Sequence, residues 1–255
     1  MSPEPRNIKL LIGYDGTEFS GWQRQNNSRT IQGEIESLLT RMTNEEIMVN
    51  GAGRTDAGVH ADGMVAHFHT ASAIPCGDFL RGLNAMLPNA IRIFHAEEVD
   101  ASFHARFSAV GKLYQYELYN GRIQPPRLRL HTLHVLSSLD VLTIRQCLAI
   151  ILGTHDFSSF ENSGSRDKNA CSGRGAVRTI QETVLIENSH ELLSLQFKGD
   201  GFLRNMIRNL VGTLLEAGRG KITAREFAAI LAAKDRSMAG PTAPAHGLCL
   251  KKVFY

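Results

Sequence analysis

Residues 51–63 read GAGRTDAGVHADG, and this stretch decides how the rest of the chain is interpreted. It places one aspartate, Asp56, among glycines and other small residues, between two apolar segments. We predict that these segments, Ile47–Gly51 and Met64–His69, are strands whose ends fix the loop in space. On turn chemistry alone, the favoured interpretation is an Asx-type turn in which Asp56 caps its own backbone. A functional role for Asp56 therefore needs support from elsewhere in the sequence.

The neighbours of Asp56 have the chemistry of a ligand site. Gly53 and Gly58 can adopt positive φ angles and allow a ligand backbone to come close. Arg54 and Thr55 place hydrogen-bond donors beside the carboxylate. A connection that only had to turn would not need so many special residues.

Outward from this loop, the first part of the chain predicts strands and helices in the order strand–helix–strand–strand–helix–strand. Alternating apolar residues predict a strand over Asn7–Tyr14, and helical spacing behind the N-cap Thr30 predicts a helix over residues 31–42. A second helix is expected from Pro75 to Leu87, and another strand over Ile91–Val99.

The second part of the chain repeats this mixture of strands and helices. We expect strands over Ser108–Tyr119, Val177–Glu187, Leu192–Lys198 and residues 247–255, and helices over Leu139–Leu152, Leu203–Ala217 and Thr223–Lys234. A polar loop is expected over Asn162–Gly175. These elements predict an α+β fold of two similar lobes, residues 1–105 and 106–255. Each lobe should hold a mainly antiparallel sheet flanked by helices, with an active-site cleft between the lobes.

The composition indicates an ordinary globular protein of the cytoplasm. The chain has 255 residues, and no stretch approaches the roughly 20 apolar residues that cross a bilayer. The start of the sequence does not resemble a secretory signal. The four cysteines are widely spaced, which suits neither a disulfide framework nor a zinc knuckle. A net charge of +3 is too small to establish a nucleic-acid partner by itself.

The segment GRTDAGVHA, residues 53–61, resembles the signature loop of the TruA family of tRNA pseudouridine synthases. Further segments resemble the family in the same order along the chain: YDGTEFSGWQRQ (14–25), FHARFSA (103–109), KLYQYELYN (112–120), FLRNMIRNLVG (202–212) and APAHGLCL (243–250). The resemblance implies the pseudouridine synthase fold and a homodimer. It also implies isomerisation of uridine to pseudouridine at positions 38, 39 and 40 in the anticodon stem-loop of tRNA, without a cofactor.

The same resemblance implies roles for individual residues. Asp56 would be the catalytic carboxylate, and Arg208 would pair with it and keep it ionised. Tyr114 would stack on the target uracil, and Arg54 would hold a phosphate or fill the space that the target nucleotide leaves. Periodicity alone favours a plainer role for Arg208, on the solvated face of a helix that also carries Arg204. For Tyr114, a cross-strand aromatic role is as well supported by the pattern as a ligand role.

We expect tRNA to contact basic residues dispersed over several loops, rather than one linear basic motif. The candidates are Arg24, Arg106, Arg166 and Lys168. His67 and His69 share one face of a predicted strand, but strand-face histidines are usually plain surface residues and no third ligand is near them in the sequence. We therefore predict no catalytic metal.

Two alternative functions stay open. An RNA or nucleoside N-glycosidase would cleave the same C1′ bond with the same carboxylate and admit water. A non-catalytic tRNA-binding protein would keep the fold without the reaction.

Overall fold

The computed structural model describes residues 5–162, 175–188 and 191–255. The chain forms two compact units: Met1–Val110 together with Cys249–Tyr255, and Gly111–Leu248. The lobes expected at 1–105 and 106–255 stay a prediction. The seven C-terminal residues, which that prediction assigns to the second lobe, lie in the first compact unit.

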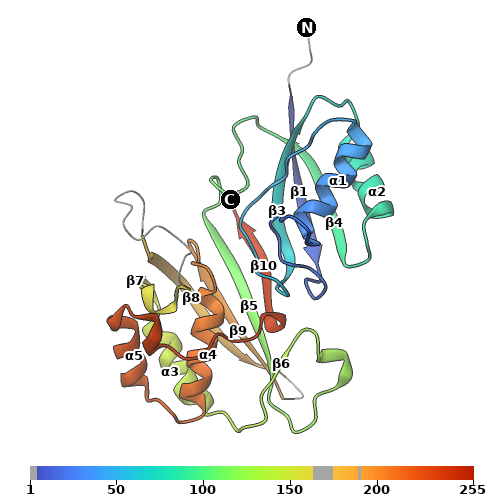
Figure 1. The fold of residues 1–255 in the computed structure, drawn as a ribbon. Coiled ribbons are helices and arrows are strands. Elements are labelled where there is room, and N and C mark those ends of the chain that lie inside the picture. Colours follow the sequence, from blue (N-terminus) through green and yellow to red (C-terminus); the bar gives the residue numbers. More distant parts are fainter. Residues whose placement is uncertain (1–4, 163–174, 189–190) are drawn as a thin grey trace. The chain divides into compact units, whose positions relative to one another are not determined.

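The first unit is built on a sheet with the strand order β4-β1-β3-β10, and β2 pairs with β3 (Figure 1). β1 runs antiparallel to both β3 and β4, and β10 runs parallel to β3. The strands are β1 (Arg6–Tyr14), β2 (Asn50–Gly51), β3 (His60–Thr70), β4 (Ile91–Val99) and β10 (Leu248–Phe254). Along residues 6–99 the elements follow the predicted order strand–helix–strand–strand–helix–strand, which is therefore confirmed.

Two helices, α1 (Ile31–Thr43) and α2 (Cys76–Met86), complete the first unit. The N-cap prediction is confirmed, because the Thr30 side chain accepts a hydrogen bond from the Gly33 amide. Helix α2 packs on β4, and α1 packs beside α2. Fully buried aliphatic and aromatic side chains from the sheet and both helices form the core: Ile8, Leu10, Ile12, Ile31, Ile35, Phe68 and Phe79.

Two predicted strands next to the Asp56 loop have different limits in the structure. β2 is only Asn50–Gly51, instead of Ile47–Gly51, while β3 starts at His60 instead of Met64. Gly63 looks like a loop residue in the sequence, but it lies inside β3. A side chain at Gly63 would collide with the carbonyl of Lys251 in β10, so the strand needs glycine at this point.

The second unit contains a sheet with the order β5-β9-β8-β7, in which all three neighbouring pairs are antiparallel. A short β6 pairs with β5 in parallel. The strands are β5 (Gly111–Tyr119), β6 (Leu133–His134), β7 (Gly153–Asp156), β8 (Val177–Glu187) and β9 (Leu192–Gly199). The strand pairings within the two units confirm the predicted α+β class with mainly antiparallel pairing.

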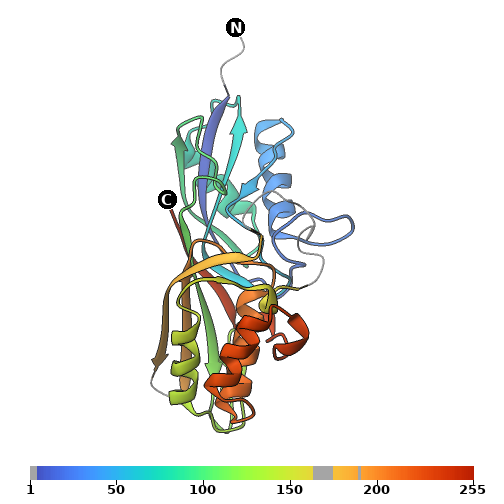
Figure 2. The same cartoon turned by 90° about the vertical axis from the view of Figure 1, so that its left-hand side faces the viewer.

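Three helices, α3 (Val141–Ile150), α4 (Met206–Gly218) and α5 (Ala224–Ala233), pack together over one face of this sheet (Figure 2). Helix α4 starts at Met206 and not at Leu203, because Asn205 at its N-cap has a left-handed backbone with φ 59°. Arg204 therefore precedes the helix, which corrects the prediction that it shares a helical face with Arg208. In the part of the chain that the structure describes, no helix is long and apolar enough to span a membrane.

Candidate active site

The Asp56 loop connects β2 and β3 and closes in a four-residue turn. The Val59 amide donates to the Asp56 carbonyl over 3.1 Å, and Gly58, the third residue of the turn, has φ 77°. A positive φ at this position is the reason that the turn needs glycine. Gly58 thus uses the positive φ that glycine allows, whereas Gly53 is not among the residues with positive φ. The Asp56 side chain itself is half-buried.

The segment from Tyr14 to Trp22 packs against this loop and is hydrogen-bonded to it. The Trp22 amide donates to the Thr55 carbonyl over 3.1 Å, and the Gly58 amide donates to the Phe19 carbonyl over 3.3 Å. The Tyr14 and Thr55 hydroxyls are hydrogen-bonded at 2.7 Å in a buried position. Asp56 therefore lies between residues whose backbones are fixed on both sides.

Gly21 packs closely against the loop. A Cβ atom at Gly21 would lie 2.6 Å from the Thr55 carbonyl oxygen and 3.1 Å from the Asp56 carbonyl carbon. Gly21 also has φ 93°, which disfavours any other residue there. Glycine is thus required at residue 21 both by the backbone conformation and by the lack of space.

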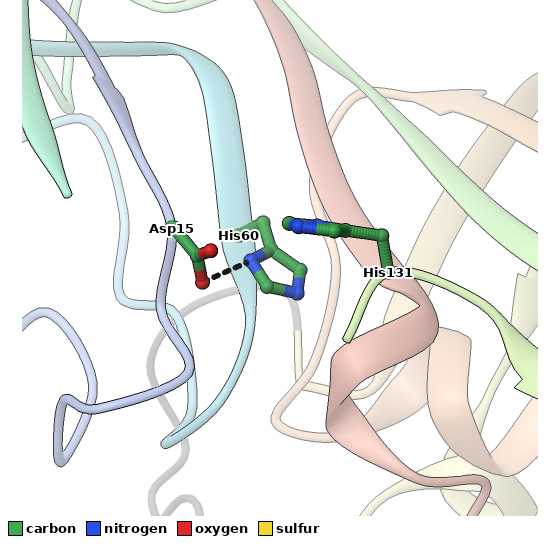
Figure 3. Close-up of side chains that lie close together, drawn as sticks. All are labelled: Asp15, His60 and His131. Atoms are coloured by element: carbon green, nitrogen blue, oxygen red, sulfur yellow. Dashed lines mark ion pairs between the residues drawn. The ribbon is translucent and has the colours of Figure 1, made fainter. Parts of the chain in front are cut away.

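Asp15 and His60 join the same two segments at the start of β3 (Figure 3). The His60 Nδ1 atom accepts a hydrogen bond from the Gly16 amide over 3.1 Å, and an Asp15 carboxylate oxygen lies 3.2 Å from the same nitrogen. The Asp15 carboxylate also accepts hydrogen bonds from the Thr17 amide and hydroxyl, which closes an Asx turn. The hydrogen bond from the Gly16 amide to His60 ties the segment after β1 to the end of the Asp56 loop, where it enters β3.

Arg54 and Tyr114 lie on different elements. Arg54 is exposed, two residues before Asp56 in the same loop. Tyr114 is on β5, opposite Phe197 of β9, and its ring packs edge-on against Phe202 with the centroids 5.2 Å apart.

Tyr116, two residues further along β5, lies on the same face and has a structural role. Its side chain is fully buried, and its hydroxyl donates to the Pro244 carbonyl over 2.7 Å. Burial raises the pKa of Tyr116, while the nearby charge of Arg208 acts in the opposite direction.

Arg208 lies in the first turn of α4 and is half-buried. Its Nε atom donates to the Ala243 carbonyl over 2.8 Å, and its Nη1 atom donates to the Asn205 side chain over 3.0 Å. The Ala243 amide in turn donates to the Arg208 carbonyl. These bonds hold the guanidinium in one orientation, so Arg208 is more than a charge on a solvated helix face.

The residues expected to bind RNA have different surroundings. Arg24 is mostly exposed and pairs at 3.1 Å with the buried carboxylate of Glu36. Arg106 is exposed in the segment that follows β4. Arg166 and Lys168 lie outside the described residues.

His67 and His69 share a face of β3 as predicted, with ring centroids 5.5 Å apart, but only His69 is a surface residue. His67 is buried, and its Nδ1 atom accepts a hydrogen bond from the Ala105 amide over 3.2 Å. Burial, together with the neighbouring His104 and His69, lowers the pKa of His67 to about 4. His67 is thus a neutral hydrogen-bonding residue of the interior.

Sequence reasoning missed the residues that hold the candidate site in place. Tyr14 and Gly21 belong to the segment YDGTEFSGWQRQ, which resembles the family but has no pattern that predicts its contact with the Asp56 loop.

Asn209, next to Arg208 in α4, is a further residue that sequence reasoning missed. Its amide nitrogen donates to the Phe160 carbonyl and to Asn162 Oδ1, and its Oδ1 accepts from Arg236 Nη2 at 3.1 Å and from Thr242 Oγ1 at 2.6 Å.

Comparison with known proteins assigns the class of protein. The family model for tRNA pseudouridine synthases matches residues 11–108 and 148–255, a range that includes the Asp56 loop, β10 and α4. Proteins of this class are isomerases.

Individual relatives agree with this class over their whole length. The chain is 57% identical to "tRNA pseudouridine synthase A 1" of Desulfotalea psychrophila, with 98% of this chain and 100% of the relative covered. It is 46% identical to "tRNA pseudouridine synthase A" of Acetivibrio thermocellus and 43% identical to the protein of the same name of Geobacter sulfurreducens, with the same coverage. The chain belongs to the tRNA pseudouridine synthase family.

Proposed function

We propose that this protein converts uridine to pseudouridine at positions 38, 39 and 40 in the anticodon stem-loop of tRNA, with Asp56 as the catalytic carboxylate and no cofactor. The observation that carries the proposal is the support of the Asp56 loop by its hydrogen bonds with Tyr14, Phe19 and Trp22. A carboxylate that must meet one atom of a large substrate benefits from being fixed before the substrate arrives.

The reaction suits a single carboxylate. The bond between ribose C1′ and uracil N1 breaks, the uracil turns, and C1′ joins C5, while C5 loses a proton and N1 gains one. No electrons are gained or lost, so the chemistry needs a nucleophile or base and a place for the base to turn. Asp56 supplies the carboxylate in this proposal.

Tyr114, Arg208 and Arg54 are the proposed substrate-binding residues. The Tyr114 ring, which is buried and packs edge-on against Phe202, would stack on the target uracil. Arg208 presents a guanidinium whose orientation is set by Ala243 and Asn205, and it would pair with the Asp56 carboxylate. Arg54 is exposed beside Asp56, where it would hold a phosphate or occupy the space of the everted nucleotide.

The proposal also covers the residues that contact tRNA, the oligomeric state and the cellular location of the enzyme. Arg24, Arg106, Arg166 and Lys168 would contact the phosphates of tRNA, and affinity would then fall steeply with salt. The protein would work as a homodimer in the cytoplasm. Two compact units within one chain are consistent with the two lobes that the family resemblance implies.

The test is the pair of variants Asp56→Asn and Asp62→Asn. Asp62 is an exposed carboxylate of the same chain segment that pairs with Lys251, which makes it a matched control. We expect Asp56→Asn to abolish pseudouridine formation in purified tRNA while its affinity for tRNA stays within roughly threefold of the parent. Asp62→Asn should turn over normally. An active Asp56→Asn protein would refute the role of Asp56.

The products separate the alternative functions. Incubation with uridine-labelled tRNA should leave the base attached through a carbon–carbon bond at positions 38, 39 or 40. Free uracil and abasic RNA would instead identify an N-glycosidase. Binding without any change in the RNA would identify a tRNA-binding protein.

A further inference from the structure

The segment from Asp100 to Ser108, between β4 and β5, is held against the first unit by hydrogen bonds with the side chains of Asn7, His67 and Tyr255. The Asn7 side chain donates to the carbonyls of Asp100 and Phe103 at 3.0 and 2.9 Å. Ala105 is held from both sides, because its amide donates to His67 and its carbonyl accepts from the Tyr255 hydroxyl at 2.7 Å. The backbone of this segment therefore has little freedom.

The tip of the segment is folded around His104. Its Nδ1 atom accepts from the amides of Arg106 and Phe107 at 3.1 and 3.3 Å. The Ser108 amide donates to the His104 carbonyl, and the Ser108 hydroxyl accepts from the His104 amide at 3.1 Å. The His104 imidazole and the Ser108 hydroxyl thus fix the backbone of Arg106 and Phe107 by hydrogen bonds.

Phe107 is 76% exposed although it stands on this ordered support. Its ring leans on the His104 ring, with the centroids 4.3 Å apart and the planes at 34°. The Arg106 guanidinium lies 5.7 Å from the Phe107 centroid. The result is an aromatic surface whose position is fixed before binding and which has a cation beside it.

The surroundings of Phe107 favour a nucleic acid as its partner. Residues 101–110 contain one arginine, two serines and no carboxylate, so the chain on either side of Phe107 carries no negative charge. An aromatic face with an adjacent arginine is the combination that binds unpaired bases, the ring by stacking and the arginine by contact with phosphate or base.

We propose that Phe107 is a nucleobase-stacking site that holds one unpaired nucleotide of the bound tRNA, with Arg106 at the adjoining phosphate. This inference rests on the proposed function, because it assumes that tRNA is the substrate. It adds to that function an anchoring contact outside the group of residues that act on the target uridine. His104 and His67 are positioning residues for this contact.

Three variants test the stacking site: Phe107→Ala, Phe107→Trp and, as a control, Phe94→Ala. Phe94 is another exposed phenylalanine of the same unit, at 56%, but it lies on β4 away from this tip. Loss of one stacked base should weaken the binding of tRNA by roughly 5- to 150-fold in Phe107→Ala, measured by filter binding at fixed salt. Phe94→Ala should bind like the parent, and Phe107→Trp should stay within about twofold of it because it keeps a stacking face.

Phe107→Trp also gives a direct signal. The chain has one tryptophan, Trp22, which is 3% exposed, so the parent protein provides the background. Emission from the new indole should be quenched by tRNA beyond the change seen in the parent, because a stacked base quenches an indole. Unquenched emission, or unchanged affinity in Phe107→Ala, would overturn the proposal.

Oligomeric state and turnover distinguish a stacking residue from a protein contact and from a residue that acts on the target uridine. If Phe107→Ala changes the molar mass in solution, Phe107 is a protein contact and the stacking site is refuted. At saturating tRNA, Phe107→Ala should form pseudouridine at the parent rate. If the parent itself forms none, the proposed function fails, whereas normal turnover with unchanged affinity in Phe107→Ala removes only the stacking site.

Discussion

The substitution Gly21→Ala tests whether close packing behind the Asp56 loop sets the position of the carboxylate. The new Cβ atom would lie 2.6 Å from the Thr55 carbonyl oxygen, and an ordinary contact begins at 3.4 Å, so the two segments must separate by about 0.8 Å. The left-handed backbone at φ 93° adds about 1–2 kcal/mol for any residue with a Cβ atom. Forced overpacking costs a further 1–3 kcal/mol, roughly. We therefore expect a total loss of about 2–5 kcal/mol in the free energy of unfolding.

Gly220→Ala is the matched control for this substitution. Gly220 has φ 73°, and a Cβ atom there would meet nothing within 4 Å, so it carries the backbone cost without the collision. Urea unfolding of both variants isolates the steric part as the difference between them. Pseudouridine formation should fall by roughly 100-fold in Gly21→Ala, since a displacement near 1 Å at a reacting group can have that effect, and should be unchanged in Gly220→Ala. Equal stability losses together with full activity in Gly21→Ala would refute the reasoning.

Two further predictions concern the interior. Because the pKa of His67 is lowered to about 4, between about pH 6.5 and pH 4 the unfolded chain binds a proton at this residue while the folded chain does not. Stability should thus fall with decreasing pH, by about 2 kcal/mol between pH 7 and pH 5, and urea unfolding of His67→Gln should lack this part of the pH dependence. Asn209→Ala should cost about 2–4 kcal/mol in chemical denaturation, because Arg236 and Thr242 lose their common buried acceptor. A loss below 1 kcal/mol would show that water replaces the amide.

Much of the fold follows from local sequence patterns. The first helix could be predicted because Thr30 is a strong N-cap in front of helically spaced apolar residues, and the structure confirms that cap. β6 and β7 could not be predicted, since two and four residues are too short to show a period. Apolar spacing continues through Leu203, so the sequence predicts an α4 that begins three residues too early. In the structure the left-handed backbone of Asn205 prevents the helix from beginning before Met206.

In the candidate site, too, local sequence patterns could be read, whereas contacts between distant segments could not. Asp56 stands out because glycine, arginine and threonine surround it in one short stretch. The hydroxyl of Tyr14 and the missing side chain of Gly21 matter only because they meet Thr55 across more than 30 residues of sequence, and single-sequence patterns carry no information about such pairs. His67 was misjudged for a related reason, since the amide of Ala105 that covers it comes from a distant segment.

The parallel pairing of β10 with β3 has a consequence for how the protein is made. Cys249 and Leu250 lie opposite His60 and Ala61, directly after the Asp56 loop. While a ribosome is still producing residue 240, β3 has β1 on one flank, and on the other flank β2 pairs with Ala66 and His67 but the edge at His60 and Ala61 is still open. Translation must therefore run almost to Tyr255 before the sheet beneath the proposed catalytic loop is finished, and nascent chains shorter than this are unable to complete that sheet.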